Sequence, residues 1–378
     1  GSGRRSAVTR RPAALGVYIS RCLLRRLQST FNICKSDLRS ETRARPRVSA
    51  MTSFPGRGPP PAAAAHLAPA DVADARALRD AGGALLPGGD GVTVAGWDIR
   101  TRRTPILGKE ALAGLEARLG TPHLPEMVYG SVLELTHAAS DTRVHFNAED
   151  ALREWLEEDL PPLKVAAAAK WAEAHKLRFG GGLPPSKAAG AGAPVPSAAW
   201  DTSEDSSAYD WTFTTPYRGS VGTASGNPPD GSWKKRWAET SRRVDRQALM
   251  ERDPILFFDE LTLYESELDD NGESSVTVKI RVMPKCWFVL MRFWMRCDGV
   301  RVRLRETRFF CPMTTEAAKK KPIVIRESAR RDESFEELRA RGAPGDASQY
   351  PDADEAAAVL LAAGGPVEMA YHEIEHEE

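Results

Sequence analysis

The sequence predicts an α+β fold, in which a single mixed domain of antiparallel β-meander sheets packs with a few helices behind a disordered N-terminal arm. Residues 275–282 (SVTVKIRV) alternate apolar and polar side chains, as a half-buried strand requires. Asn271-Gly272 and Asp298-Gly299 are dipeptides that favour tight hairpin turns. Together these two observations predict a meander of four strands at roughly 255–267, 274–283, 286–297 and 300–310.

Residues 1–90 are predicted to form the arm. Residues 1–50 contain twelve Lys and Arg but two acidic residues, and apolar residues recur there every four positions: Leu15, Ile19, Leu23 and Leu27. This pattern resembles an organellar transit peptide, and the alternative is that the native chain starts at Met51. From Met51 to about residue 90, Ala, Pro and Gly dominate, a composition that cannot bury enough apolar area to fold.

The domain is predicted to occupy residues 91–350. A helix is expected over 111–119, where Gly120 follows the last apolar position. Asn147 can cap a second helix, with Asp150 reaching back to the cap, and this helix should end before Pro161. The ordered part is expected to begin near 92–97, and the fold to resume at 209–215, which is dense in β-forming residues. The other expected elements are strands at 128–137 and 143–146, and helices at 163–175, 237–250, 328–339 and 356–363.

Two segments are expected to lie outside the regular structure. Residues 179–208 are rich in Gly, Pro, Ala and Ser, which is typical of a flexible insert, and a further loop is expected over 220–232. Residues 351–378 form an acidic tail that is expected to be loose at its end.

The hairpin at Asp298-Gly299 predicts a surface with two chemically different faces. A two-residue turn would pair Arg296 with Arg301, Trp294 with Arg303 and Arg292 with Arg305. The opposite face would then pair Met295 with Val302 and Phe293 with Leu304. The prediction is an apolar core face and a cationic face built of guanidinium groups around an indole.

Like charges that oppose each other across strands destabilise a sheet, so acidic groups are expected to cover these arginines. A partner protein could supply them, or the face could simply be solvated. The chain's own candidates are the acidic residues just upstream: Asp259, Glu260, Glu265, Glu267, Asp269 and Asp270.

The composition narrows the classes of protein. The formal net charge is zero, and no apolar run is long enough to cross a membrane. The five cysteines form no C-x-x-C pair, which favours free thiols in a reducing compartment. We expect a monomeric protein of the cytoplasm, with the nucleus and, through the arm, an organelle as alternatives.

No catalytic or cofactor motif is supported. His372-Glu-Ile-Glu-His376 matches H-E-x-x-H, but it lies in the tail behind the helix breaker 364–366 and has no third ligand. The start of a calcium loop at Glu267 has Val278 where a bidentate glutamate belongs. Because phosphate-binding loops and nucleophile elbows are also missing, we predict neither an enzyme nor a bound cofactor.

Several ordered segments carry a family resemblance. They are 124–127 (LPEM), 146–153 (FNAEDALR), 163–165 (LKV), 209–215 (YDWTFTT), 273–284 (ESSVTVKIRVMP) and 298–300 (DGV). In this order they resemble TIPRL, the TOR-signalling-pathway regulator-like family, over roughly 92–350. The arm and the insert lie outside the resemblance.

The resemblance implies a function. Members of the family bind the catalytic subunits of type 2A-like serine/threonine phosphatases, including their C-terminal tail, without catalysing a reaction themselves. It further implies a role in TOR signalling and in phosphatase biogenesis or inhibition. The family positions for phosphatase binding fall on Asp150, Val244, Leu304 and Glu306.

The two lines of reasoning combine into one hypothesis. An apolar floor at Leu304 beside a rim of Arg301, Arg303 and Arg305 would suit an extended peptide that ends in a carboxylate. The alternative is a single-stranded nucleic-acid binder that stacks bases on Trp294 among arginines, although the domain without its arm is acidic. A hydrolase or isomerase with a site assembled from unlinked positions is the third class.

Overall fold

The computed structural model describes residues 75–121, 124–158, 160, 163, 211–224, 237–268, 271–316 and 320–374. Most of the predicted arm, most of the predicted helix at 163–175, the insert 179–208 and the acidic residues Asp269 and Asp270 lie outside these ranges. Residues 75–90, which the sequence analysis assigned to the arm, form helix α2 (Ala75–Asp80) and strand β1 (Ala84–Leu85). They are ordered because Leu78 packs into the main core and is 2 % exposed.

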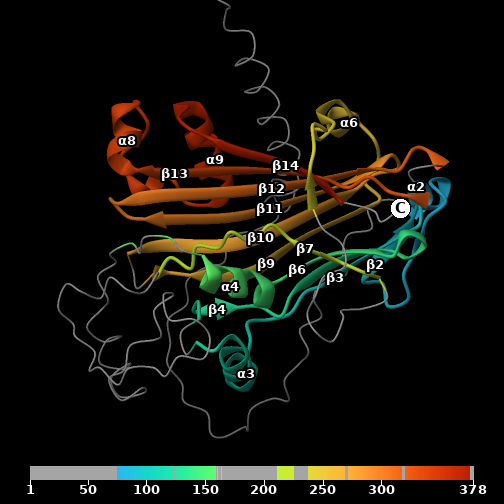
Figure 1. Cartoon of the computed structure of the whole chain (residues 1–378), viewed down its shortest axis with the longest axis horizontal. Helices are drawn as coiled ribbons and strands as arrows, with labels where there is room; N and C mark the ends of the chain where they lie inside the picture. The colour runs from blue at the N-terminus through green and yellow to red at the C-terminus, as the bar shows by residue number, and fades with distance from the viewer. Residues whose placement is uncertain are drawn as a thin grey trace, which may run out of the picture.

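The described residues form two antiparallel sheets (Figure 1). The small sheet has six strands in the order β1, β2 (Gly91–Val94), β3 (Trp97–Arg102), β5 (Val132–His137), β6 (Thr142–Asn147) and β7 (Ser220–Gly222). The large sheet has eight, in the order β4 (Met127–Val128), β9 (Phe257–Ser266), β10 (Gly272–Val282), β11 (Cys286–Cys297), β12 (Arg301–Pro312), β13 (Ile325–Ser334), β14 (Glu368–Ile374) and β8 (Trp237–Glu239). The α+β class and the four-strand meander β9–β12 are therefore confirmed.

The main core lies between the sheets. We call the side of the large sheet that faces the small sheet its inner face, and the other side its outer face. Inner residues of β10 and β11, such as Val278 and Phe293, share one apolar cluster with Ile99 and Leu135 of the small sheet. Cys286, Cys297 and Cys311 are buried free thiols, as expected.

Helices cover both sheets (Figure 1). On the small-sheet side, α3 (Lys109–Leu119) and α4 (Ala148–Glu157) pack together, and α4 begins at Asn147, whose side chain accepts from the Asp150 amide. On the outer face of the large sheet, α8 (Phe335–Ala340) and α9 (Ala353–Ala363) cover one apolar cluster. Helix α6 (Arg246–Met250) covers another.

The hairpin between β11 and β12 corrects the predicted register. The loop has three residues, 298–300, because Cys297 pairs with Arg301 and the Val300 amide donates to the Cys297 carbonyl at 3.0 Å. Gly299 supplies the left-handed backbone, with φ of 71°, that such a loop needs. Every partner therefore shifts by one residue, so that Trp294 pairs with Leu304 and Met295 with Arg303.

Several segments have a secondary structure that the sequence analysis did not predict. Residues 328–339, predicted as a helix, form most of β13 and then α8, because β12 and β14 pair with both edges of β13. Residues 237–250 form strand β8 and the short helix α6 in place of one helix. The end of the acidic tail is not loose up to Ile374, since residues 368–373 pair with β13. Residues 211–215 are buried but form no strand.

Candidate functional site

The inner face of the large sheet changes character where it extends past the small sheet. On β12, apolar Phe309 gives way to arginines at 305, 303 and 301, which share its face because side chains alternate along a strand. On β13, the same face carries Arg326, Ser328, Arg330 and Asp332. An eight-stranded sheet is wider than a six-stranded one, so this polar strip is left for α4 and the 211–219 segment to cover.

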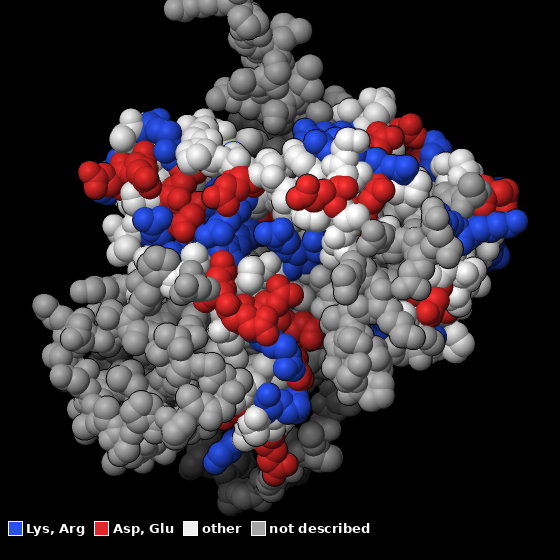
Figure 2. Space-filling model, in the orientation of Figure 1, with Lys and Arg blue, Asp and Glu red and all other residues white. Residues whose placement is uncertain are grey.

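We call the space between this strip and α4 the inter-sheet cleft. Figure 2 shows acidic side chains gathered over α4, directly facing a band of basic side chains over the neighbouring strands of the large sheet. The residues that define the cleft here are Glu154, Glu158, Arg218, Ser220, Arg305, Arg326 and Arg330.

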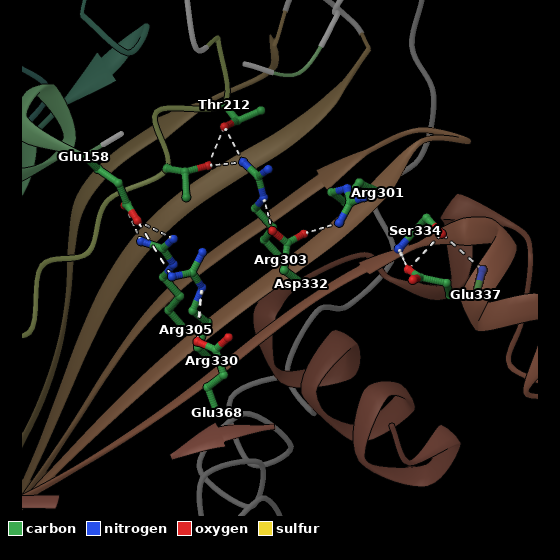
Figure 3. Close-up of polar contacts among 11 residues, drawn as sticks. Glu158, Thr212, Arg301, Arg303, Arg305, Arg330, Asp332, Ser334, Glu337 and Glu368 are labelled. Carbon is green, nitrogen blue, oxygen red and sulfur yellow. Dashed lines mark hydrogen bonds and ion pairs between the residues drawn. The ribbon is translucent and has the colours of Figure 1, made fainter. Parts of the chain in front are cut away.

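The β12 arginines are neutralised within the chain (Figure 3). Arg301 and Arg303 both donate to Asp332, at 2.7 and 3.0 Å, and Arg303 also reaches Thr214 at 2.9 Å. Arg305 holds Glu158 through two hydrogen bonds of 2.6 and 2.9 Å. The expected acidic cover exists, but β13 and the end of α4 supply it, and not the acidic residues just upstream of the hairpin.

A second pair of guanidinium groups lacks such partners. Arg218 and Arg326 line a pocket of about 430 Å³, and neither guanidinium group forms a hydrogen bond or ion pair with any residue that the structure describes. Arg326 is 7 % exposed, its Nε has no acceptor, and its guanidinium lies 4.2 Å from the ring of Trp237. Arg218 precedes Gly219, where a side chain would clash with Phe146 because a Cβ would lie 2.5 Å from its ring.

The pKa values of two groups that line the pocket, Glu154 and Arg326, are shifted from their ordinary values. Burial, together with the carboxylates of Asp150 and Glu157, raises the pKa of Glu154 to about 7. Burial and the neighbouring Arg218 lower the pKa of Arg326 to about 9. At neutral pH the pocket therefore contains two guanidinium charges and a carboxyl group that is close to its titration midpoint.

Asp150 lies at the start of α4, beside the cleft. Its Oδ2 accepts from Ser220 at 2.6 Å, from Asn147 at 2.9 Å and from His145 at 3.0 Å. Burial alone would raise the pKa of this carboxyl, but the hydrogen bonds from His145 and Ser220 outweigh burial and lower it. Asp150 therefore ties α4 to β6 and β7 and fixes the wall of the cleft.

The other three positions implied by the resemblance lie on the outer face of the large sheet. Leu304 is 2 % exposed beneath α8 and α9, and Val244 is 5 % exposed in the cluster under α6. Glu306 accepts from Arg292 and Arg308 at 3.3 and 3.1 Å, and after the opposing effect of burial these cations lower its pKa to about 2. The structure thus brings Val244, Leu304 and Glu306 to one face and Asp150 to the other.

The predicted peptide groove and base-stacking platform are both wrong. Leu304 and Arg303 lie on opposite faces, as predicted, but Leu304 is covered by helices and Arg303 is 4 % exposed, so no open groove joins them. Trp294 shares the face of Leu304 and is 1 % exposed, which removes the surface on which bases would stack.

Metal and membrane sites find no support in the described part of the chain. No three His, Cys, Asp or Glu side chains gather there in an arrangement that could hold a metal ion. His372 lies on strand β14, so the H-E-x-x-H match does not start on a helix, and its last two residues lie outside the described ranges. Among the helices described, none has the length and apolar character that a membrane crossing needs.

Known proteins place the chain in a family. Residues 127–339 match the model of the TIP41-like family. The chain belongs to the TIP41-like family. A TIP41-like protein of Arabidopsis thaliana is 41 % identical over 291 residues, which cover 74 % of this chain and 91 % of that protein. The human TIP41-like protein is 34 % identical over 57 % of this chain and 68 % of its own length.

The fungal TIP41-like proteins carry functional names. The protein of Saccharomyces cerevisiae named type 2A phosphatase activator TIP41 is 30 % identical over 252 residues, which cover 66 % of this chain and 65 % of that protein. The predicted family is therefore confirmed. Membership agrees with the expectation of a phosphatase regulator that is not itself an enzyme.

Sequence reasoning missed Arg218, Arg326 and Glu154. Arg326 was hidden because β13 has polar residues on both faces, so the sequence shows no apolar alternation. Gly219, which follows Arg218, has a φ of 77° and packs against two phenyl rings, but only the structure shows this, so nothing in the sequence marked Arg218.

Proposed function

We propose that this TIP41-like protein is a non-catalytic regulator that binds the catalytic subunit of type 2A-like serine/threonine phosphatases, including its C-terminal tail. The observation that carries the proposal is the inter-sheet cleft, an open polar surface in the body of the TIP41-like region. Two of its guanidinium groups, Arg218 and Arg326, are unpaired among the residues that the structure describes and suit an acidic or carboxylate-ended segment of a partner. The name of the yeast relative supports the choice of phosphatase as partner.

In this proposal the partner peptide binds in the inter-sheet cleft, whereas the sequence hypothesis placed it on the arginines of β12. Arg301, Arg303 and Arg305 are already held by Asp332 and Glu158, so a ligand would have to displace short, partly buried ion pairs. A ligand could bind Arg218 and Arg326 without first displacing an ion pair among the described residues. On the outer face, Val244, Leu304 and Glu306 would then support binding through the position of β12 and β13.

The test is direct binding of the full chain to a purified type 2A-like catalytic subunit. We expect a complex by size-exclusion chromatography with the intact subunit and weaker binding when its C-terminal tail is deleted. A type 1 phosphatase catalytic subunit is the matched control and should not be retained. Absence of a complex with the intact type 2A subunit, at low salt as well, would overturn the proposal.

We also propose that the complex acts in TOR signalling in the cytoplasm, and that the free chain is monomeric. Activity of the phosphatase in the presence of the full chain distinguishes inhibition from a role in biogenesis, because only inhibition lowers turnover of a preassembled enzyme. In cells that lack this chain, we expect altered phosphorylation of TOR-dependent substrates. Unchanged phosphorylation would remove the TOR role and leave the binding proposal in place.

A further inference from the structure

A segment near the C-terminus covers part of the outer face of the large sheet without contributing a strand to it (Figure 1). We call residues 342–365 the flap; they contain α9 and a short 3-10 helix, Ala347–Gln349. The flap connects α8 to β14 and lies just past residue 339, the last that the family model matches. Beneath it lie Trp294 and Leu304, which are 1 % and 2 % exposed.

Glycines stand at both ends of the flap. Gly342 and Gly364 have φ of 76° and 71°, in the left-handed region that glycine adopts without steric cost. A Cβ at either position would meet no neighbouring atom within 4 Å, so these glycines serve the backbone conformation and not close packing. Hinges in proteins are often short stretches of this kind. The flap is therefore bounded by two positions about which it can rotate as a unit.

Few apolar side chains fix the flap to the sheet. It contributes four buried side chains to the outer-face cluster, and two of these are alanines: Tyr350, Ala356, Ala357 and Leu360. Apolar stabilisation grows with the area buried, so the alanines add little to what the tyrosine and the leucine supply. The flap can therefore separate at a much smaller cost in free energy than a strand such as β11, which is buried on both faces.

The ion pairs of the flap can break without leaving unpaired cations on the sheet. Asp354 of α9 accepts from Arg292 and, at 3.0 Å, from Lys279. Lys279 also lies 3.2 Å from Glu260, and Arg292 lies 3.3 Å from Glu306. Both cations would keep a carboxylate partner when Asp354 leaves. Opening therefore avoids the large cost of an unpaired buried charge at these two positions.

A buried donor under the flap has no acceptor. The Nε1 of Trp294 forms no hydrogen bond with any residue that the structure describes, although buried polar groups are nearly always paired. The flap thus covers the indole without completing its hydrogen bonding. A bound segment that offered an oxygen at this point would satisfy the indole better than the flap does.

We propose that the flap is an autoinhibitory cover, which opens about its two glycine ends and exposes a docking site for an amphipathic helix of a partner protein. Helix α9 shows the chemistry that the site accepts, because it is itself bound there. It has an acidic residue in its first turn, Asp354, and then apolar residues on one face, including Ala357 and Leu360. The inter-sheet cleft lies on the other face of the sheet, so this site is independent of the phosphatase proposal.

The first test is native-state hydrogen exchange of the full chain at low urea concentrations. We expect the α9 amides to exchange as one cooperative unit, at least about tenfold faster than those of β11 and β12. Leu360→Asp should raise the α9 rates at least about tenfold further, because it removes the buried leucine. Ala362→Asp, the same substitution at an exposed position of α9, is the matched control and should change them by less than about threefold.

The second test supplies α9 as a separate molecule. A labelled peptide of residues 350–366 is titrated into the native chain and into the Leu360→Asp chain. We expect the variant to bind the peptide at least about tenfold more tightly, because the native flap occupies the site at a high effective concentration. A peptide that carries Leu360→Asp itself is the matched control and should not bind.

Two results would overturn the inference. One is exchange of the α9 amides only through global unfolding, which the native chain reveals by itself even if Leu360→Asp fails to fold. The other is equal peptide binding by the native and variant chains, or none by either. Asp354→Asn repeats the peptide comparison with a substitution that keeps the apolar contacts. A failed complex with the phosphatase would overturn the proposed function and leave the flap in place.

Discussion

Two groups of arginines lie on the inner side of the large sheet, and their surroundings differ. The row Arg301, Arg303 and Arg305 is bonded to Asp332, Thr214 and Glu158. Among the described residues, Arg218 and Arg326 form no ion pair: Arg326 lies against the ring of Trp237, and the carboxyl group of Glu154 lines the same pocket. The row holds β12, β13 and α4 together, whereas the pair makes no such link among the described residues and is the part of the cleft that we propose for a partner.

The difference shows that a run of arginines does not by itself mark a binding surface. Four arginines between 301 and 308 attract notice in the sequence, yet each of them is ion-paired within the chain. Arg218 and Arg326 are more than a hundred positions apart and meet only in the fold. Whether an arginine can bind a ligand depends on its neighbours in space, because an existing ion pair has to be broken before the ligand can bind that arginine.

The largest effect is expected from Arg303→Ala. The guanidinium is 4 % exposed and its removal leaves Asp332 and the hydroxyls of Thr212 and Thr214 short of a donor. Loss of one partner of a buried ion pair costs about 3–5 kcal/mol of unfolding free energy. Urea denaturation measures it, with Arg102→Ala as an exposed control expected to stay within about 0.5 kcal/mol. A loss below about 1 kcal/mol would mean that the row is not structural.

A smaller loss is expected from Arg305→Ala. Arg305 and Glu158 are each 11 % exposed at the side chain, and their two hydrogen bonds tie β12 to the end of α4. Hydrogen bonds to charged groups contribute about 1.5–3 kcal/mol, so a double-mutant cycle with Glu158→Gln should give coupling of that order. Additive single and double variants would show that the contact does not stabilise the fold.

A still smaller effect concerns Glu154 and pH. Its pKa is raised to about 7, so the carboxyl is protonated below pH 7 and charged above it. Once charged, the Glu154 carboxylate competes with a bound ligand's carboxylate for Arg218 and Arg326. A peptide of the phosphatase C-terminal tail with a free carboxyl end should therefore bind this chain about two- to tenfold more tightly at pH 6 than at pH 8. Glu154→Gln should bind at both pH values as the native chain does at pH 6. Tighter binding at pH 8 would contradict the assignment.

The same carboxyl has a consequence for stability. A carboxyl whose folded pKa is raised above its unfolded value destabilises the fold as pH rises from about 4.5 to 7, because the unfolded state releases its proton first. Glu154→Gln should therefore be at least as stable as the native chain at pH 8. Its urea midpoint at pH 4 should match that of the native chain, which serves as the internal control.

The smallest effect on stability is expected from Arg326→Met. Replacing an unpaired buried charge by an apolar side chain of similar length is neutral or stabilising, by roughly 0–2 kcal/mol. The contrast with Arg303→Ala sharpens the comparison, since both arginines are more than nine-tenths buried. A loss as large as that of Arg303→Ala would show that Arg326 has a structural partner and would weaken the case for an anion pocket.

The hairpins show how far local patterns reach. The alternation at 275–282 and the turn dipeptides located β10, β11 and β12 to within a few residues, because side-chain period and turn chemistry are local properties. Pairing depends on one residue in the loop. Val300 belongs to the loop and not to the strand, so the register is shifted by one residue. Trp294 therefore lies on the buried face with Leu304 and not on the predicted cationic face.

The C-terminal part shows where local patterns fail. Residues 325–334 carry polar side chains on both faces, so nothing in their sequence favours a strand over a charged helix. They form β13 because β12 and β14 offer backbone partners on both edges. The helix at 353–363 was predictable because its alanines and leucine pack on one side and Gly364 ends it.

The sequence by itself determined the fold class, the meander, the capped start of α4 and the family, since each depends on residues that are neighbours along the chain. Only the tertiary structure decided which charges are used up within the molecule. Arg305 meets Glu158 across 147 positions and Arg303 meets Thr214 across 89. Coulomb energy depends on the distance between charges in space, and desolvation depends on the atoms that surround them. A carboxylate far along the chain can therefore neutralise one arginine, while another arginine has no such partner among the described residues.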